Sequence, residues 1–313
     1  MTLTQLRYAL SVAKYGNFTL AAKEIFVTQP TLSMQVKKLE DELGVTLFDR
    51  NKKPVVPTEI GTQILAQARV ILNESSRIRD LVDREKGVAT GDFTLGIIPT
   101  IAPALLPLFL QPFLEKYTQV NLHIRELQTD SVIRSLKDGQ IDAGIAATPL
   151  DQPGLVESPL YVEPFVGYVP ENHRLSGKKQ LSVNDLNIRD ILLLKSGHCF
   201  RNNVVNLCDA LPGAHKRANI DSGSFETMVR LSNQGFGMTL LPYLTASKLC
   251  GEEKRYMKNF TPPVPSREVS MLYNEAALKL HTIQALAETI DNAIKTLIFL
   301  EDAQVISPLQ KPL

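Results

Sequence analysis

Two of the chain's three cysteines lie in one short segment, together with a histidine and an arginine. The segment reads GHCFRNNVVNLC and places Cys199 and Cys208 nine positions apart, with His198 and Arg201 beside the first cysteine. The thiolate is the reactive form of cysteine, and a helix N-terminus or a nearby positive charge favours it. Because Cys199 follows the strand-like run ILLLK and is expected to open the next helix, its position is typical of a thiol that reacts with peroxide.

The spacing of the pair predicts a structural change if the two cysteines become joined. In an unbroken helix their Cα atoms would lie about 13 Å apart along the axis, whereas a disulfide needs roughly 4.4–6.8 Å. The Asn and Val residues between them, 202–206, are mediocre helix formers, so the segment is easily unwound. Oxidation to a disulfide would therefore act as a conformational switch.

Two other uses of the pair stay open. Zinc could bind with His198 and His215 as further ligands, although this arrangement matches no familiar zinc pattern. A thiol peroxidase would also use a reactive cysteine, although it would place that residue in a compact catalytic fold. The third cysteine, Cys250, lacks such neighbours and is predicted to be buried and inert.

The composition is that of a folded, soluble chain with more than one domain. Of its 313 residues 44% are hydrophobic and 21% are charged, and roughly 100–200 residues per domain predicts two or three folded units. No apolar run reaches the length of a membrane span and the first residues do not read as a signal peptide, so a cytoplasmic protein is expected. Structural disulfides are rare in that reducing compartment, which favours a redox, catalytic or metal-binding role for the cysteine pair.

The first ninety residues predict a DNA-binding module. Apolar positions at helical spacing predict a helix over 4–14, a shorter one over 18–25, a turn at 26–27, and a third helix that begins after Thr28. An ordinary three-helix cluster fits these helices equally well, but a short basic hairpin follows them and favours DNA. The candidate DNA-contacting residues are Gln29, Pro30, Thr31, Ser33, Gln35 and Lys37 on the third helix and Arg50, Lys52 and Lys53 on the hairpin.

The charge balance and the next helix support this interpretation. Residues 1–90 carry 13 Lys and Arg against 10 Asp and Glu, whereas the rest of the chain carries 21 against 23. From Thr58 to about residue 85 a helical apolar period continues without proline, which predicts a helix about 40 Å long. A long amphipathic helix without a local partner commonly pairs with a second copy. Residues 87–92, GVATGD, are expected to form a hinge.

The stretch FVTQPTLSMQVKKLEDELGVTLFDR resembles the DNA-binding signature of the LysR-type transcriptional regulators. The resemblance implies a winged helix-turn-helix over 1–58 and a linker helix with a hinge over 59–91, through which two copies dimerise. It also implies a two-lobed regulatory domain over 92–313, shaped like a periplasmic binding protein. Such regulators usually assemble as tetramers and bind double-stranded operator DNA.

Residues 92–300 by themselves predict an α/β fold. Short apolar runs such as FTLGII and IDAGIAA alternate with helical patterns, which is typical of a sheet with crossover helices. Two lobes are expected, with the second over about 162–267. Gly235 and Gly237 form a GxG that precedes a strand, the reverse of a dinucleotide loop, so we interpret it as a turn. Thr100 and Thr129 follow predicted strands, where α/β folds place ligand contacts, although capping the next helix is an equally good role.

Within the LysR-type family the segment SGHCFR, with a second cysteine nine residues later, resembles the redox segment of the members that sense hydrogen peroxide. That resemblance implies a peroxidatic Cys199 and a resolving Cys208. It also gives peroxide-positioning roles to Thr100, Thr129, His198 and Arg267. The implied partners are operator DNA, hydrogen peroxide, RNA polymerase, a thiol reductant and further copies of the chain in a homotetramer, with no cofactor and no metal. A regulator that binds a small metabolite between its lobes remains the main alternative.

Overall fold

The chain folds into two compact units, Met1–Lys86 and Gly87–Leu313. The computed structural model describes residues 1–85, 89–208, 222–275, 277, 279–298 and 302–309. Over these ranges no helix combines the length and the hydrophobicity that a membrane crossing needs. Each unit has its own hydrophobic interior.

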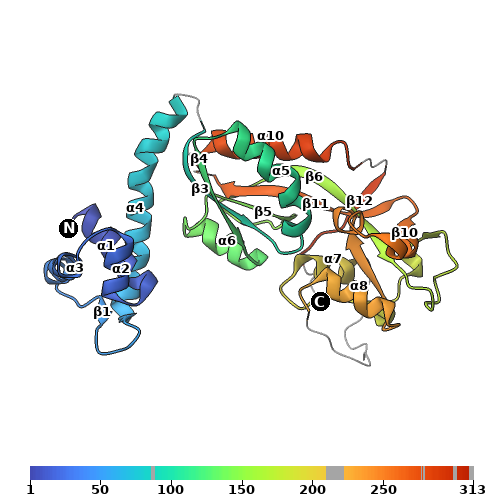
Figure 1. Ribbon diagram of the computed structural model, residues 1–313, viewed down its shortest axis with the longest axis horizontal. Helices are drawn as coiled ribbons and strands as arrows, with labels where there is room; N and C mark the ends of the chain where they lie inside the picture. The colour runs from blue at the N-terminus through green and yellow to red at the C-terminus, as the bar shows by residue number, and fades with distance from the viewer. Residues whose placement is uncertain (86–88, 209–221, 276, 278, 299–301, 310–313) are drawn as a thin grey trace. The chain divides into compact units, whose positions relative to one another are not determined.

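The N-terminal unit is a helical cluster with a two-stranded hairpin (Figure 1). Its elements are α1 (Leu3–Tyr15), α2 (Phe18–Glu24), α3 (Gln29–Leu43), β1 (Phe48–Asp49), β2 (Val56–Pro57) and α4 (Glu59–Glu85). The ends of the helices follow from the sequence. Gly16 and Gly44 end α1 and α3 at φ of 58° and 69°, a left-handed conformation that glycine adopts without strain. The side chain of Thr28 accepts a hydrogen bond from the backbone of Thr31 and so caps α3.

The three-helix order and the basic hairpin predicted from the sequence are therefore confirmed. The buried side chains include Leu6, Val12, Leu32 and Val36, and α4 adds Leu65 and Ala68. Leu43, the last residue of α3, is 37% exposed, although it continues the apolar spacing of the buried Leu32, Val36 and Leu39. Glu40 is buried on that helix instead, because its carboxylate accepts a hydrogen bond from the backbone at the start of the hairpin.

Helix α4 has the length predicted for the linker. It runs from Glu59 to Glu85 without a break, and part of its apolar surface is not covered by the N-terminal unit. The exposed fractions are 42% for Ile60, 46% for Val70 and 67% for Ile78. Apolar surface of this kind along a long helix is what pairing with a second copy would bury.

The C-terminal unit is a mixed α/β structure. Its strands are β3 (Gly91–Ile97), β4 (Val120–Glu126), β5 (Ala143–Thr148), β6 (Leu155–Tyr168), β7 (Gln180–Leu181), β8 (Ile191–Leu192), β9 (Met238–Pro242), β10 (Met257–Phe260), β11 (Val264–Asn274) and β12 (Ala303–Val305). Its α-helices are α5 (Ala102–Lys116), α6 (Thr129–Lys137), α7 (Cys199–Leu207), α8 (Phe225–Asn233), α9 (Tyr243–Ala246) and α10 (Leu280–Ile294), and short 3-10 turns cover Val183–Asp185, Ile188–Asp190 and Gly251–Tyr256.

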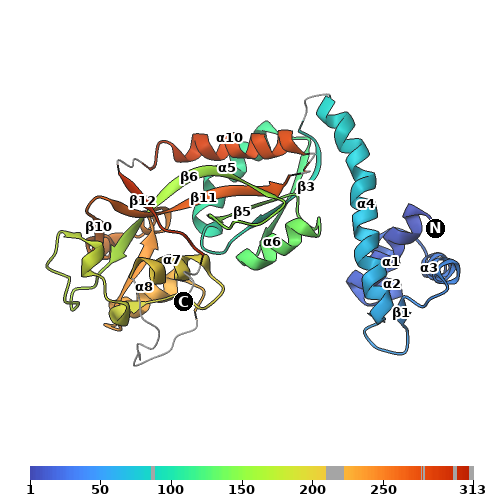
Figure 2. The same cartoon turned by 180° about the vertical axis from the view of Figure 1, so that it is seen from behind.

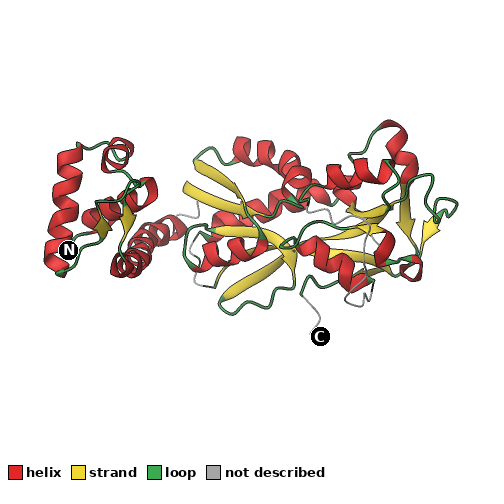
Figure 3. Ribbon diagram, turned by 90° about the horizontal axis from the view of Figure 1, so that it is seen from below, coloured by secondary structure: helices red, strands yellow, loops and turns green. Residues whose placement is uncertain are grey.

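Among the described residues the strands join in the order β4-β3-β5-β11-β6-β10-β7, with β12 beside β11, β9 beside β6, and β8 beside β9. Strand β3 is parallel to β4 and β5, whereas β11 is antiparallel to β5 and β6. Helices α5 and α10 cover one face of the first strands and α6 covers the other (Figures 1 and 2). Figure 3 shows the strands of this unit gathered in two groups with helices around each.

The two larger hydrophobic clusters of this unit, called the first and the second core, correspond to these two groups. Long strands connect them, since β6 places Leu155 in the first core and Phe165 in the second. Strand β11 likewise packs Val269 into the first core and Val264 against the second. The predicted limits of the second lobe are residues 162 and 267. Residue 162 lies inside β6 and residue 267 inside β11, in the stretch where these two strands pair.

Three local expectations can be compared with the strands. Strand β3 begins at Gly91, so the last two residues of the predicted hinge belong to the sheet instead. The run DILLLK contributes only Ile191–Leu192 to a strand, because the backbone then turns and Lys195 donates to the carbonyl of Ser222 at 2.8 Å. The GxG glycines lie in the turn between α8 and β9, as predicted.

Candidate functional site

Cys199 is the first residue of α7 and lies at the junction of the two cores. Gly197, at φ 91°, turns the chain into the helix in a conformation that favours glycine. Cys199 is only 7% exposed and packs with the first core, whereas the next residue, Phe200, packs with the second. The predicted position at a helix N-terminus is confirmed. A structural change at this thiol would alter the packing of both cores.

Thr129 is in direct contact with the thiol. Its Oγ1 atom lies 2.6 Å from the Sγ atom of Cys199, and either atom can be the donor. Thr129 opens α6 and is itself 7% exposed, so two helix N-termini meet at this contact. The resemblance gave Thr129 a peroxide-positioning role, and the structure places its hydroxyl against the Cys199 thiol.

Arg267 forms a buried ion pair next to this contact. Its Nη2 and Nε atoms donate to Oε2 of Glu163 at 2.7 and 2.9 Å, and both residues are almost fully buried. The same guanidinium donates to Oγ1 of Thr100 at 3.3 Å and to its carbonyl oxygen at 3.1 Å. The structure thus brings Thr100 and Arg267 together, and Glu163, which pairs with Arg267 across β6 and β11, neutralises the buried charge.

His198 is buried beside Cys199 and is 4% exposed. Burial lowers the pKa of its imidazole below the ordinary value, and the charge of Lys195 lowers it further, so the ring is neutral at pH 7. Its Nε2 atom has no hydrogen-bond partner among the described residues. A side chain at position 223 would collide with this ring, because a Cβ atom built on Gly223 lies 2.9 Å from Nε2.

The environment of Cys199 differs from the sequence expectation. A protonated His198 and Arg201 were expected to favour the thiolate, but His198 is neutral and Arg201 donates to the carbonyl of Leu194 at 2.9 Å instead. Burial raises the pKa of the Cys199 thiol, while the hydrogen bond from Thr129 and the charge of Arg267 lower it in part. Desolvation outweighs these contacts because the thiol is enclosed by the first core.

This pKa predicts how oxidation of Cys199 depends on pH. Because only the thiolate attacks peroxide and the thiol form dominates at neutral pH, the second-order rate constant should rise about tenfold per unit from pH 6.5 to 8. Quenched-flow alkylation in a Cys250→Ser background would measure it. A rate constant that does not change over this range would mean that Thr129 and Arg267 outweigh burial.

The other cysteines have different surroundings. All three are thiols in the structure, with Cys208 half-buried at the end of α7. The expectation that Cys250 is buried is wrong, since it is exposed and its Sγ atom donates to the carbonyl of Lys248. Among the described residues no group of three or more His, Cys, Asp and Glu side chains is arranged to hold a metal ion. His215, the second histidine of the zinc hypothesis, lies outside the described residues.

A partly enclosed pocket of about 350 Å³ opens beside Cys199. Its walls come from α6, from the first turn of α7, and from Pro308 and Leu309 near the C-terminal end of the described chain. Thr129 and Cys199 both line it, so a small solute in the pocket can reach the thiol. The volume also exceeds what hydrogen peroxide alone requires.

The predicted DNA-contacting residues gather at the start of α3 and on the loop between β1 and β2. Most are exposed, namely Gln29, Pro30, Thr31, Lys37, Lys52 and Lys53, and Ser33 and Gln35 are half-buried. Four of these side chains have contacts inside the unit. Gln35 accepts from Gln5 at 3.4 Å, and Lys52 lies 3.9 Å from Asp49. The hydroxyls of Thr31 and Thr28 lie 2.8 Å apart, and Ser33 contacts Arg50.

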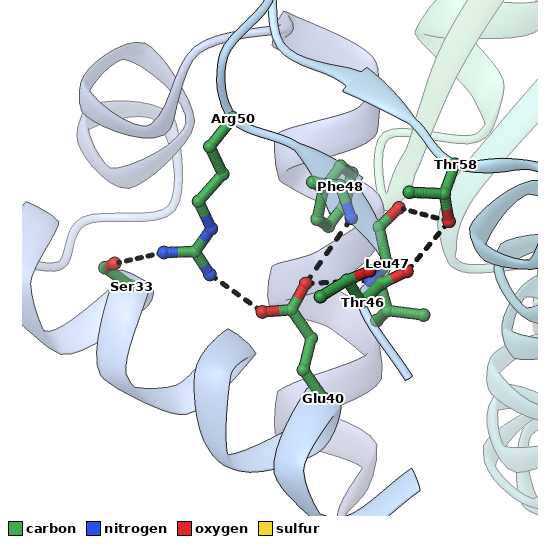
Figure 4. A network of polar contacts seen from close by, with 7 residues as sticks. All are labelled: Ser33, Glu40, Thr46, Leu47, Phe48, Arg50 and Thr58. Carbon is green, nitrogen blue, oxygen red and sulfur yellow. Dashed lines mark hydrogen bonds and ion pairs between the residues drawn. The ribbon is translucent and has the colours of Figure 1, made fainter. Parts of the chain in front are cut away.

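The guanidinium of Arg50 on this surface is held in an ion pair with Glu40 (Figure 4). It donates to Oε2 of Glu40 at 2.8 Å and contacts Ser33 at 3.5 Å. The other oxygen of Glu40 accepts from the backbone of Leu47 at 2.8 Å and, at 3.4 Å, of Phe48. Glu40 therefore links the start of the hairpin to α3, which explains why this carboxylate is buried. The same contacts position the hairpin next to the predicted recognition helix.

Three features of these sites were not identified from the sequence. Glu163 and Glu40 are buried carboxylates, and the only signal for each was a charged residue within an apolar pattern. The contact of residues 306–309 with α7 had no signal, because the two segments are about a hundred positions apart.

A helix-turn-helix unit with a basic hairpin, followed by a unit with two cores around a pocket, defines a DNA-binding transcription regulator. A family model described as the lysR-family bacterial regulatory helix-turn-helix protein matches residues 3–62, and one described as the LysR substrate binding domain matches residues 86–295. The chain belongs to the LysR family, as the sequence resemblance implied.

Several known proteins resemble the chain over nearly its full length. It is 33% identical over 297 residues, 95% of each chain, to a Streptomyces viridosporus protein named a probable hydrogen peroxide-inducible genes activator. The structure of full-length OxyR from Pseudomonas aeruginosa, a variant, aligns with a TM-score of 0.77 and 34% identity, covering 93% of this chain and 98% of that one. A hydrogen peroxide-bound OxyR variant from Corynebacterium glutamicum aligns with a TM-score of 0.65 and 31% identity, covering 94% and 93%.

Proposed function

We propose that this regulator senses hydrogen peroxide through Cys199 and converts the signal into a Cys199–Cys208 disulfide. The observation that carries the proposal is the buried Cys199 thiol, which contacts Thr129 at 2.6 Å, lines a pocket and begins the helix that Cys208 directly follows. The relatives named for hydrogen peroxide support the same ligand.

The proposed chemistry has two steps. In the first, the Cys199 thiolate attacks one peroxide oxygen, the O–O bond breaks, and hydroxide leaves, so that Cys199 becomes a sulfenic acid. In the second, the thiolate of Cys208 attacks that sulfur, the S–O bond breaks, and the departing hydroxide takes up a proton to become water. In total two thiols and one hydrogen peroxide give one disulfide and two waters. A thiol reductant reverses the change.

We assign peroxide positioning to Thr100, Thr129, His198 and Arg267. The hydroxyl of Thr129 is within hydrogen-bond distance of the sulfur and can also hold a peroxide oxygen there. Arg267 supplies positive charge that favours the thiolate and the departing hydroxide. The Nε2 atom of His198 is buried beside Cys199 and has no hydrogen-bond partner among the described residues, so it has capacity for a bond to a peroxide oxygen at the thiol.

Disulfide formation would unwind α7 and so change the packing of both cores. We infer that this change is transmitted to the operator through a cytoplasmic homotetramer, in which the exposed face of α4 pairs two copies, and that the rearranged regulator meets RNA polymerase at the promoter. The uncovered Ile60, Val70 and Ile78 side chains support the pairing. The proposed contacts with DNA are made by the exposed residues of α3 and of the hairpin.

Mapping of the thiols before and after one equivalent of hydrogen peroxide tests the proposal. We expect a Cys199–Cys208 crosslinked peptide, while the exposed Cys250 remains open to alkylation and serves as the internal control. Mass spectrometry of alkylated, digested protein would measure it. If Cys199 and Cys208 both stay reduced while Cys250 is oxidised, peroxide sensing by this pair is excluded.

The size of the pocket favours one second candidate, a regulator that binds a small metabolite there. Isothermal titration of the reduced protein with a metabolite library would reveal specific heat for such a ligand, whereas a pure thiol switch gives none. A thiol peroxidase would instead consume peroxide over many turnovers with a reductant present.

A further inference from the structure

The C-terminal end of the described chain returns to the helix that carries the cysteine pair. After β12, which lies parallel to β11, the backbone of Ile306 donates to the carbonyl of Ser266 at 2.8 Å. The segment that follows β12 then reaches α7 (Figures 1 and 2). We call residues 306–309 the strap.

Three asparagines of α7 hold the strap by their side-chain amides. Asn203 donates to the carbonyl of Ile306 at 2.5 Å, and Asn202 donates to that of Pro308 at 3.1 Å. Asn206 donates to the carbonyls of residues 307 and 309, at 2.9 and 2.7 Å. These bonds link side chains of the helix to the backbone of the strap, so they depend on the path of the strap rather than on its side chains.

Helix α7 is poorly supported by its own sequence. The side chain of its N-cap residue, His198, makes no capping hydrogen bond to the helix, and its first turn carries no acidic residue. Asparagine is also a mediocre helix former. Tertiary contacts therefore have to hold α7, through Phe200, Val204 and Leu207 in the second core and through the strap.

All three asparagines lie between the two cysteines. For Cys208 to reach Cys199, the Cα atoms must come from helical separation to about 4.4–6.8 Å, which requires unwinding of the residues between them. The amides of Asn202, Asn203 and Asn206 cannot then stay opposite the same carbonyls. The contact of Cys199 with Thr129 does not involve the strap, so the first oxidation step leaves these bonds in place.

We propose that the strap is a positioning element that holds α7 in its dithiol form and slows closure of the disulfide, an inference that rests on the proposed function. Because the strap binds the helical form and not the unwound one, it also favours the dithiol at equilibrium. By the same linkage, oxidation releases residues 306–309 from α7. The strap thus sets how much sulfenic acid is converted into the switched form.

Two variants weaken the strap to different degrees. Asn206→Ala removes two of the four hydrogen bonds, and Asn203→Ala/Asn206→Ala removes three. Neither position lines the pocket beside Cys199, whereas Asn202, Pro308 and Leu309 do. Alanine is the better helix former, so these substitutions alone would strengthen α7 and slow closure. Faster closure can then come only from the loss of the strap. Asn292→Ala, at an exposed position of α10, is the matched control.

The two oxidation steps are measured separately. Trapping the sulfenic acid with dimedone gives the first rate constant, and the appearance of the crosslinked peptide gives the closure rate constant. In both variants we expect an unchanged first step, because the pocket lining is intact, and closure about tenfold faster, because each lost hydrogen bond is worth a factor of roughly two to ten, partly offset by the alanines. The Cys199–Cys208 disulfide should also become harder to reduce. Its reduction potential should fall by about 30 mV for a tenfold shift of the dithiol–disulfide equilibrium.

Unchanged or slower closure in both variants would overturn the strap proposal, as would an equal change in both steps, which would indicate general destabilisation. Amide hydrogen exchange of the reduced protein provides a readout that does not need a disulfide. We expect faster exchange across α7 in both variants and no change in Asn292→Ala. If the native protein forms no crosslink but this exchange result holds, the proposed function fails while the strap contact stands.

Discussion

Replacing Cys199 by serine is expected to abolish the peroxide response of DNA binding while leaving the binding of the reduced protein intact. A serine hydroxyl can keep the contact with Thr129 at this buried position, so the fold of the reduced form is preserved. The variant has no thiolate there to attack peroxide, so the first step is lost and Cys208 has no sulfenic acid to resolve. Footprinting on the operator before and after hydrogen peroxide would show identical patterns.

Two companion variants make this result specific. Cys250→Ser removes an exposed thiol that lies outside the site and should respond like the native protein. Cys208→Ser should accumulate sulfenic acid at Cys199 without a crosslink, which separates detection of peroxide from the structural switch. A Cys199→Ser protein whose footprint still changes with peroxide would exclude Cys199 as the sensor.

The local features of the fold were predictable because short-range signals specify them. Thr28, Gly16 and Gly44 mark the helix ends of the N-terminal unit, and each does so through contacts or conformations within a few residues. Uninterrupted apolar periodicity likewise predicted α4. The start of α7 at Cys199 followed from the end of the preceding strand-like run.

The partners of the site were not predictable in the same way, because they come from distant parts of the chain. Glu163 and Arg267 are 104 positions apart, and only the antiparallel register of β6 and β11 brings them together. A buried arginine needs a counter-charge, but the sequence offers many carboxylates and does not say which one pairs with Arg267. The strap is a similar case, since the pairing of β12 with β11 decides where residues 306–309 lie.

The electrostatics of Cys199 show where residue type misled. Two basic neighbours in the sequence favour a thiolate, yet neither acts on the thiol as a charge. His198 loses its charge through burial, and Arg201 uses its guanidinium on a carbonyl of the loop before α7. Burial depends on the whole fold and cannot be read from a few adjacent residues. The pKa of the Cys199 thiol is therefore raised, whereas its basic neighbours in the sequence predict that it is lowered.

The Arg267→Met substitution is expected to destabilise the C-terminal unit strongly. It leaves Glu163 as a fully buried carboxylate without its counter-charge, at a cost of about 3–5 kcal/mol. For a unit of this size that corresponds to a fall in the unfolding midpoint of roughly 6–20 °C. Calorimetry of the reduced protein would measure the midpoint. A variant as stable as the native chain would mean that Glu163 is protonated or solvated without Arg267.

The double variant Glu163→Gln/Arg267→Met separates the stabilising role of Arg267 from its proposed role toward peroxide. A neutral glutamine needs no counter-charge and its oxygen can still accept the hydrogen bond from the backbone of Leu244, so most of the lost stability should return. The positive charge near Cys199 stays absent, so oxidation by peroxide should remain slow. If stability and the oxidation rate both recover in the double variant, Arg267 serves only to balance Glu163, and the charge that assists the thiol must come from another residue.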